Sequence, residues 1–389
     1  MTTVLADFHL RRAIERLRDG LFDTIAMHRL TIAEEPIKEK FTQGLAAVEL
    51  GLSTHLCICG SYGQGKSHML AQLKQEALLQ GYAASLVQLD LREVPFHQFA
   101  GVYYNLIKQL VLPDGNKFMT MWQHWGSRHA EQAAKCLTIM PHRFQMILLA
   151  MLNNKDWPHN HSWTSEEHNV QLNSSAETSA ALLTAAFMGE VLPVRQLKNI
   201  FKTQNIDGYQ KQSMLCRGNQ PYVQMIQSLG VLLHMMGYKG WVILFDEAES
   251  ITQGRLAQRA KSYAILERLF KDHGYLYSIF AYTEDFFEQI HHEEYQDIKQ
   301  TFADNYADSW VDLNIERLQN FSAAGWDSLQ ERLIQLYSEA YCIDFSKQLP
   351  KIKAKLHNLL EKLQTQETRF KLKALVSQLD IETQALGYQ

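Results

Sequence analysis

Eight consecutive residues have the types and spacing needed to bind a polyphosphate: Gly60-Ser61-Tyr62-Gly63-Gln64-Gly65-Lys66-Ser67. Glycine, lysine and serine stand at every fixed position of a phosphate-binding P-loop, and the glycines let several backbone N–H groups face one anion. Lys66 can reach the β- and γ-phosphates, and the Ser67 hydroxyl can coordinate Mg²⁺. A glycine-rich turn is the alternative, but the flanking residues favour a P-loop. The run therefore predicts binding of a nucleoside triphosphate.

A pair of acids follows an apolar segment much later in the chain, at Val242-Ile243-Leu244-Phe245-Asp246-Glu247. At the end of a buried strand, Asp246 would orient Mg²⁺ beside Ser67. Glu247 would then polarise the attacking water as a general base. The alternative is that both acids only cap the next helix. The acid pair favours hydrolysis over transfer to an acceptor.

Two further residues could sense the terminal phosphate. Thr283 follows the apolar segment 276–281 and could hydrogen-bond the γ-phosphate or the lytic water, or it could be only a helix cap. Arg369 lies near the start of the last expected helix and could reach back to the nucleotide. A solvated surface arginine is the competing interpretation for Arg369.

The elements around these motifs alternate between strand and helix. Apolar segments predict strands at 54–59, 84–90, 241–245, 276–281 and 310–313, with helices from Ser67 onward, from Pro95 to Leu112 and at 262–271. Strands that alternate with helices imply parallel βαβ units. We therefore expect an α/β P-loop NTPase fold with a parallel sheet.

The sequence also predicts how the chain is divided. Residues 1–50 read as an N-terminal helical segment, and residues 51–318 as the P-loop core. Within that core, residues 113–235 are too long for one connection and form a helical and loop insertion, the first choice for a partner-binding surface. Residues 319–389 show a wholly helical pattern and predict a small C-terminal helical domain.

Composition limits the setting of the protein. The formal net charge of −4 argues against a wholly basic surface, although a local basic patch could still bind DNA. Five cysteines without regular spacing fit reduced thiols, and no apolar run is long enough to cross a bilayer. We expect a cytoplasmic protein that is not inserted in a membrane.

Together these motifs resemble the AAA+ ATPase plan, in which a sheet domain is followed by a helical lid. That resemblance makes the P-loop Walker A, Asp246 and Glu247 Walker B, Thr283 sensor 1 and Arg369 sensor 2. More narrowly, the chain resembles the ATPases of bacterial BREX phage-defence islands (the BrxD-like group). Three stretches carry this second resemblance, at 11–20, 60–70 and 237–249. In the second, His68 continues the loop as in that group and joins the expected nucleotide contacts.

One departure from the AAA+ plan concerns the arginine finger, which in many members lies between sensor 1 and the lid. From Thr283 to Glu316 the chain contains no arginine, and Lys299 cannot reproduce the bidentate fork of arginine. Three arginines at other positions could take this role, or a partner could supply it: Arg255, Arg259 and Arg268. Slow hydrolysis, as in a switch, is a further alternative.

These inferences combine into one expectation, an ATP-binding, Mg²⁺-dependent ATPase of a phage-defence system. It would act with protein partners or DNA, and assembly into homo-oligomers is left open. The alternatives are a slowly hydrolysing nucleotide-dependent switch and, with less support, a small-molecule kinase. Mg²⁺ would be held by Ser67 and Asp246, and catalysis would use Lys66, Glu247, Thr283 and Arg369. The expected nucleotide-binding residues are Gly60, Ser61, Tyr62, Gly63, Gln64, Gly65, Lys66, Ser67 and His68.

Overall fold

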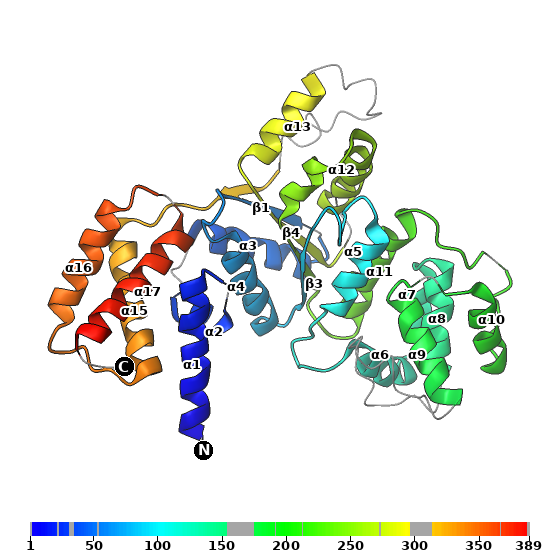
Figure 1. The fold of residues 1–389 in the computed structure, drawn as a ribbon. Helices are drawn as coiled ribbons and strands as arrows, with labels where there is room; N and C mark the ends of the chain where they lie inside the picture. The colour runs from blue at the N-terminus through cyan, green and yellow to red at the C-terminus, as the bar shows by residue number, and fades with distance from the viewer. Residues whose placement is uncertain are drawn as a thin grey trace.

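The computed structural model describes most of the chain (Figure 1). The described residues are 2–21, 23–30, 35–52, 54–153, 175–190, 192–211, 213–271, 274–295, 313–365 and 367–386.

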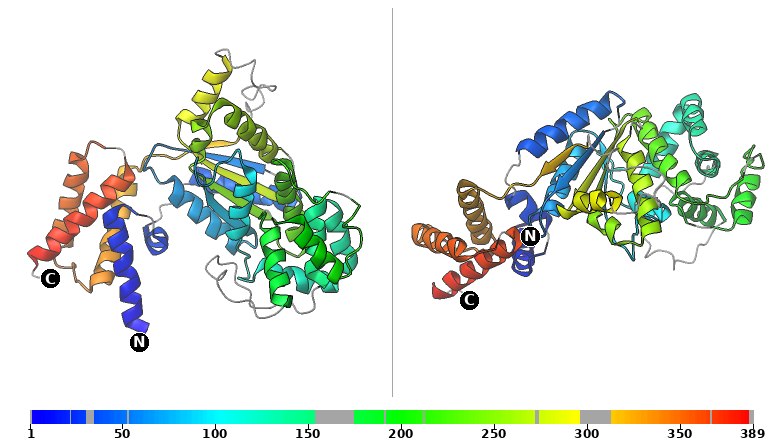
Figure 2. Two further views of the ribbon diagram at one scale, coloured as in Figure 1. Left: turned by 45° about the vertical axis from the view of Figure 1, so that its right-hand side comes forward. Right: turned by 90° about the horizontal axis from the view of Figure 1, so that it is seen from above.

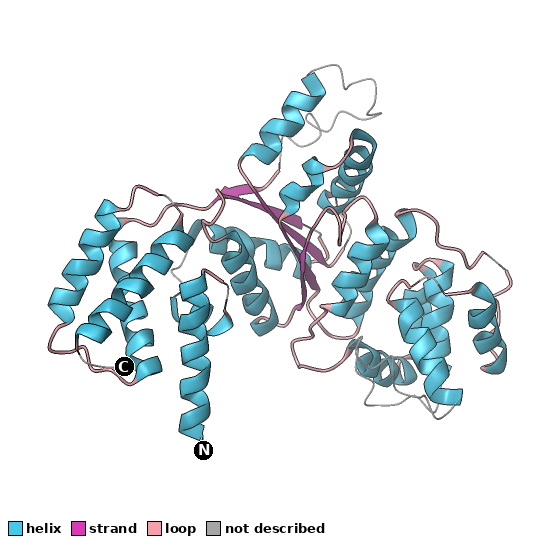
Figure 3. Ribbon diagram, viewed as in Figure 1, coloured by secondary structure: helices cyan, strands magenta, loops and turns pink. Residues whose placement is uncertain are grey.

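A five-stranded parallel sheet forms the centre of the molecule (Figure 3). Its strands are β1 (Thr54–Cys59), β2 (Ala83–Gln88), β3 (Trp241–Asp246), β4 (Leu276–Tyr282) and β5 (Ile315–Arg317). They lie in the order β2-β3-β4-β1-β5, so β4 separates the P-loop strand β1 from the acid-bearing strand β3. The predicted α/β fold with a parallel sheet is confirmed.

The fifth strand differs in position from the prediction. It covers Ile315–Arg317 and pairs with β1, whereas the sequence favoured 310–313. Of the predicted segment only Leu313 lies in the described part of the chain, and it precedes the strand. The strand is three residues long at the sheet edge and carries two charged side chains, so it lacks the apolar run by which buried strands are recognised.

Helices cover both faces of the sheet. On one face, α3 (Glu35–Glu49) and α4 (Lys66–Leu79) pack against side chains such as Leu56, Val242 and Ile279. The other face is covered by α5 (Phe99–Lys108), α11 (Gln220–Met235) and α12 (Leu256–Phe270), over side chains such as Phe245 and Phe280. Adjacent strand residues alternate between the two cores, as the period of two requires.

Most of the segment predicted as an insertion, 113–235, forms a cluster of helices beyond α5 and α11 (Figure 1), whereas its last helix, α11, packs on the sheet. The members of the cluster are α6 (Phe118–Arg128), α7 (Ala130–Thr138), α8 (His142–Asn153), α9 (Ser175–Phe187) and α10 (Val194–Thr203). Their apolar side chains join the core on the α5 and α11 side of the sheet.

The C-terminal helices form a second compact body together with the first two helices of the chain (Figure 2). This body contains α15 (Ala323–Tyr341), α16 (Leu349–Lys362), α17 (Thr368–Ala385), α1 (Thr2–Asp19) and α2 (Thr24–Leu30). Ile14 and Leu333 are fully buried in its core. Arg18 on α1 forms an ion pair of 2.8 Å with Asp380 on α17.

The N-terminal helical segment predicted at 1–50 thus contributes to two different cores, because α3 packs on the sheet instead. None of the described helices is long and apolar enough to span a membrane.

Candidate functional site

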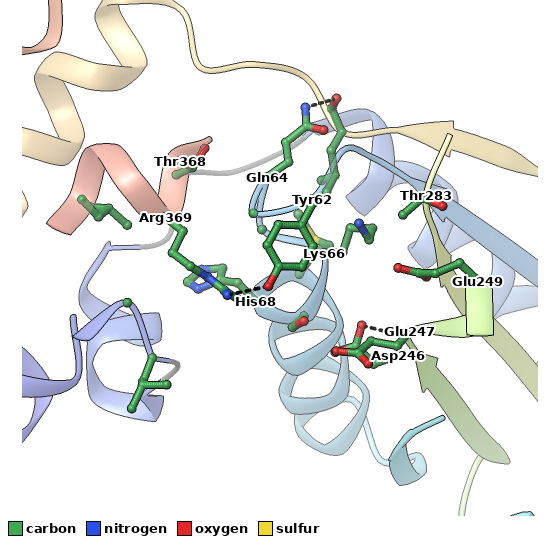
Figure 4. Close-up of a pocket in the computed structure, with 18 of the residues that line it drawn as sticks. Tyr62, Gln64, Lys66, His68, Asp246, Glu247, Glu249, Thr283, Thr368 and Arg369 are labelled. Atoms are coloured by element: carbon green, nitrogen blue, oxygen red, sulfur yellow. Dashed lines mark hydrogen bonds between the residues drawn. The ribbon is translucent and has the colours of Figure 1, made fainter. Parts of the chain in front are cut away.

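The predicted site residues gather at the carboxyl edge of the sheet. Strands β1, β4 and β3 run parallel and adjacent, so the P-loop, Thr283 and Asp246 emerge side by side. All three line one cavity of about 830 Å³, which lies between the sheet and the C-terminal helices (Figure 4). That volume is within the range of small-molecule and cofactor sites.

The P-loop backbone requires glycine at two positions. Gly63 has φ of +73° and Gly65 has φ of +112°, values that side chains with a Cβ rarely adopt. Gly65 precedes Lys66, where α4 begins, so the first N–H groups of that helix face the loop. A helix N-terminus with free N–H groups favours bound anions.

Lys66 is held inside this loop and is only 8% exposed. Its ammonium Nζ donates to the Gly60 carbonyl oxygen at 2.8 Å and to that of Ser61 at 3.2 Å. These bonds keep the charge at the loop's centre, where a phosphate would meet it.

Gln64 ties the loop to the segment that leads into the C-terminal helices. Its Oε1 accepts a hydrogen bond from the Ser61 N–H at 2.7 Å, while its Nε2 donates to the Leu318 carbonyl oxygen at 2.8 Å and to Asn320 Oδ1 at 3.3 Å. The loop and this connecting segment are therefore mechanically linked, a role that the motif alone did not predict.

Asp246 and Glu247 lie together at the end of β3 (Figure 4). Asp246 is 9% exposed, and its Oδ1 accepts from the Glu247 N–H at 3.0 Å. Glu247 is exposed to the cavity and has a left-handed backbone, with φ of 53°. Such backbone strain in a residue other than glycine is concentrated at functional sites.

Glu249 is a further acid in the cavity that the sequence reasoning missed. It lies in the 3₁₀ helix η2 (Ala248–Gln253), and its side chain points toward the P-loop side of the cavity (Figure 4). Its Oε2 is buried and forms no hydrogen bond with the described residues. Burial is the main cause that raises the pKa of this carboxyl; Lys66 opposes the shift, and Asp246 and Glu247 add to it. The spacing Asp-Glu-Ala-Glu was the available signal.

Arg369 lines the cavity at the start of α17, where its backbone N–H donates to the Gly63 carbonyl oxygen at 3.2 Å. Its guanidinium lies 5.4 Å from the centre of the Tyr62 ring, and Nη1 donates to the Tyr62 hydroxyl at 3.3 Å. The C-terminal helices thus contact the P-loop directly, with Tyr62 and Arg369 at the boundary (Figure 4).

The end of the cavity formed by α1, α2, the residues between them and the C-terminal helices is mainly apolar, although Asp23 also lines it. The apolar side chains there include Leu17, Leu21, Leu30, Leu329 and Leu372. A flat aromatic base would find apolar contacts there while its phosphates reached the P-loop. The cavity therefore has the two-sided character that a nucleotide requires.

His68, the second residue after Lys66, faces this cavity from α4. Burial lowers the pKa of its imidazole to about 4, with a smaller contribution from His28. His68 is consequently a neutral group at pH 7, able to donate or accept one hydrogen bond from each ring nitrogen.

The oxygen donors at this site suit a magnesium ion. Ser67 and Asp246 both line the cavity, and Mg²⁺ is usually held by one or two protein oxygens together with substrate phosphates and water. The remaining arginines named above are placed elsewhere: Arg255, Arg259 and Arg268 lie on α12 or its N-terminal flank and do not line the cavity.

Comparison with known proteins identifies a family that fits this geometry. A family model described as BREX system ATP-binding protein BrxC/D matches residues 9–137 and 218–389. These ranges contain every residue assigned to the site, whereas residues 138–217 of the insertion lie outside the match. No curated protein sequence matches the chain.

Proposed function

Because this chain belongs to the family of BREX system ATP-binding proteins BrxC/D, we propose that it hydrolyses ATP with Mg²⁺ and uses the reaction to change its conformation in anti-phage defence. The observation that supports hydrolysis most strongly is the meeting of Lys66, Asp246 and Glu247 in one cavity with the P-loop.

Each residue has a role that follows from its place. The N–H groups of the P-loop and the Lys66 ammonium would hold the phosphates, and Ser67 with Asp246 would hold Mg²⁺, which neutralises charge on the β- and γ-phosphates. Glu247 would accept a proton from water, and Thr283, next to it along the sheet edge, would orient that water or the γ-phosphate.

The C-terminal helices supply the proposed link to conformation. Arg369 contacts the P-loop from α17, and Gln64 contacts the segment entering α15, so a ligand at the loop would be connected to this helical body at the starts of two of its helices. We propose that this body acts as a lid that closes over bound ATP and that Arg369 senses the terminal phosphate.

A Lys66→Ala substitution tests the site. It removes the positive charge at the loop's centre, so we expect ATP affinity to fall by at least about 100-fold, on the order of 3 kcal/mol. Isothermal titration with ATP and Mg²⁺ measures this, and Lys117→Ala, an exposed lysine just before α6, is the control. Unchanged ATP affinity in Lys66→Ala would overturn the site assignment.

A slow nucleotide-dependent switch is a second candidate function. Lys66, His68 and Arg369 are the basic residues among those lining the cavity, and the arginines on α12 do not reach it. Beyond Arg369, the described residues that line the cavity within one copy of the chain therefore include no second arginine of the kind that accelerates phosphoryl transfer in many ATPases. Turnover measured with and without duplex DNA, alongside mass in solution with and without ATP, separates the two. A rate that DNA leaves unchanged, with a constant monomer mass, favours the switch.

A further inference from the structure

The exposed side chains of helix α10 are all basic or hydrogen-bonding, and Val194 is partly buried. Its apolar side chains Leu197, Ile200 and Phe201 are buried, and the helix packs against α8 and α9. The exposed residues of the helix are Arg195, Gln196, Lys198, Asn199, Lys202 and Thr203. These are side-chain types that contact nucleic-acid phosphates.

The three cations lie close together on the helix surface. Arg195, Lys198 and Lys202 are spaced i, i+3 and i+7, which places them on one side over a rise of about 10 Å. None of them forms an ion pair with the residues that the structure describes. Their charge is thus available to an external anion.

The segment that follows α10 continues this charge. Lys211 and Arg217 are exposed, and Asp207 is the single acid from residue 191 to 217. The Tyr209 ring lies 5.8 Å from that of Phe201, so this segment turns back against the helix. A region with five cations and one acid stands out in a chain whose formal net charge is −4.

We propose that the α10 face, defined by Arg195, Lys198 and Lys202, binds the phosphate backbone of a nucleic-acid duplex without reading its sequence. The residues lie outside the family match and at the edge of the molecule away from the C-terminal helices (Figure 1). Binding there stands apart from ATP hydrolysis, and it would be particular to the inserted segment 138–217.

The composition of this face favours a duplex over other anionic partners. A protein partner would find no exposed apolar side chain on α10, although interface centres are typically apolar. A membrane surface would need the apolar side of the helix, which is buried against α8 and α9. Single strands are usually bound on aromatic platforms, and α10 exposes none.

Fluorescence anisotropy with a labelled duplex of about 20 base pairs tests the proposal on the full chain. The triple variant Arg195→Gln/Lys198→Gln/Lys202→Gln should bind at least 10-fold more weakly at low salt, and the slope of log K against log salt should fall by about 2 to 3.

DNA and RNA duplexes, tested separately, distinguish the two sources of phosphate backbone. The matched control Lys347→Gln/Lys351→Gln/Lys362→Gln removes three exposed charges near α16 and should change affinity by less than about 3-fold.

Several results would overturn the proposal. These are an absence of duplex binding by the native chain, an equal loss in both triple variants, or α10-dependent binding to phosphatidylserine vesicles without duplex binding. ATP affinity and thermal unfolding should be unchanged in the α10 variant, and duplex affinity should be unchanged in Lys66→Ala. A failure of the proposed ATPase function is therefore separable from a failure of this surface.

Discussion

The phosphate end of the cavity and its apolar end are held together by different parts of the fold. At the phosphate end, the P-loop follows β1 directly and the acids follow β3 directly, so the sheet alone aligns them. At the apolar end, α1 meets α15 and α17, and Arg11 Nε on α1 donates to the carbonyl oxygen of Ala340 at 2.9 Å.

Residues at the phosphate end therefore act mainly in binding and hydrolysis, whereas residues below the apolar end act mainly in packing. Substitutions at the phosphate end should alter hydrolysis or phosphate affinity with little effect on folding, because the side chains face a cavity. Substitutions in the core below the apolar end should lower stability and weaken ATP binding indirectly, because that wall exists only while distant helices pack together.

The largest effect is expected at the phosphate end, where Glu247→Gln and Glu249→Gln are compared as two separate variants. Removing the general base should lower hydrolysis by on the order of 100-fold in Glu247→Gln while ATP still binds. Glu249→Gln should lower it by about 10-fold or less, because that acid shapes the field around Lys66. Steady-state phosphate release measures hydrolysis in both variants. A greater loss in Glu249→Gln would mean that Glu249, and not Glu247, is the general base.

The core beneath the apolar end should respond through stability. Ile14 is fully buried between α1 and the C-terminal helices, so Ile14→Ala should cost about 2–4 kcal/mol in the free energy of unfolding. Leu45→Ala, also buried but on the sheet side, should cost a similar amount. Denaturant unfolding measures both, and ATP affinity should fall only in Ile14→Ala. An equal fall in both variants would remove the contrast between the two ends.

Gln64 connects the two ends, so its loss should have an intermediate effect. Gln64→Ala removes hydrogen bonds to Ser61, Leu318 and Asn320, together worth about 1 kcal/mol, and ATP affinity should fall by roughly 5-fold. Titration with ATP measures this, with the exposed Gln43→Ala on α3 as control. An unaltered affinity would mean that the loop holds its shape without this link.

The last effect is expected from His68, is absent at pH 7, and develops only as the pH falls. Its folded pKa is about 4 against an ordinary value of 6.5, so between these values the unfolded chain binds a proton that the folded chain does not. The residue therefore lowers stability as pH falls from 6.5 toward 4 and has no such effect above 6.5. His68→Gln should reduce the loss by up to about 1.4 kcal/mol per pH unit.

Urea unfolding at pH 7, 6 and 5 measures this dependence, with the exposed His124→Gln as control. Parallel stability curves for native protein and His68→Gln would contradict the assigned burial.

The sequence predicted the phosphate end well because its signals are local. The strand 54–59 was assigned with the bounds that the structure has, and the P-loop residues stand at fixed spacing after it. The joint placement of Lys66, Asp246 and Thr283 in one cavity follows from parallel strands, although their catalytic roles stay predictions.

The rest depended on contacts between distant residues, for which one sequence carries no pattern. The sequence predicted that residues 1–50 are helical, but nothing in it names Leu333 or Leu375 as the packing partners of α1. Tyr62 and Arg369 are similarly 307 positions apart. Glu249 could have been predicted, since it lies two residues beyond Glu247, but its direction depends on the short 3₁₀ helix η2, for which the sequence carries no signal.

The packing of α1 and α2 with the C-terminal helices also has a consequence for how the protein is made. α1 and α2 leave the ribosome before the sheet domain, yet most of the core that surrounds Ile14 comes from residues beyond 320. The sheet domain can fold while the apolar side of α1 is still uncovered, because its packing partners have not yet been made. The nucleotide cavity can therefore close only after residues 323–385 have been made, and slow translation of those residues would prolong the period in which α1 is open to chaperones or to misassembly.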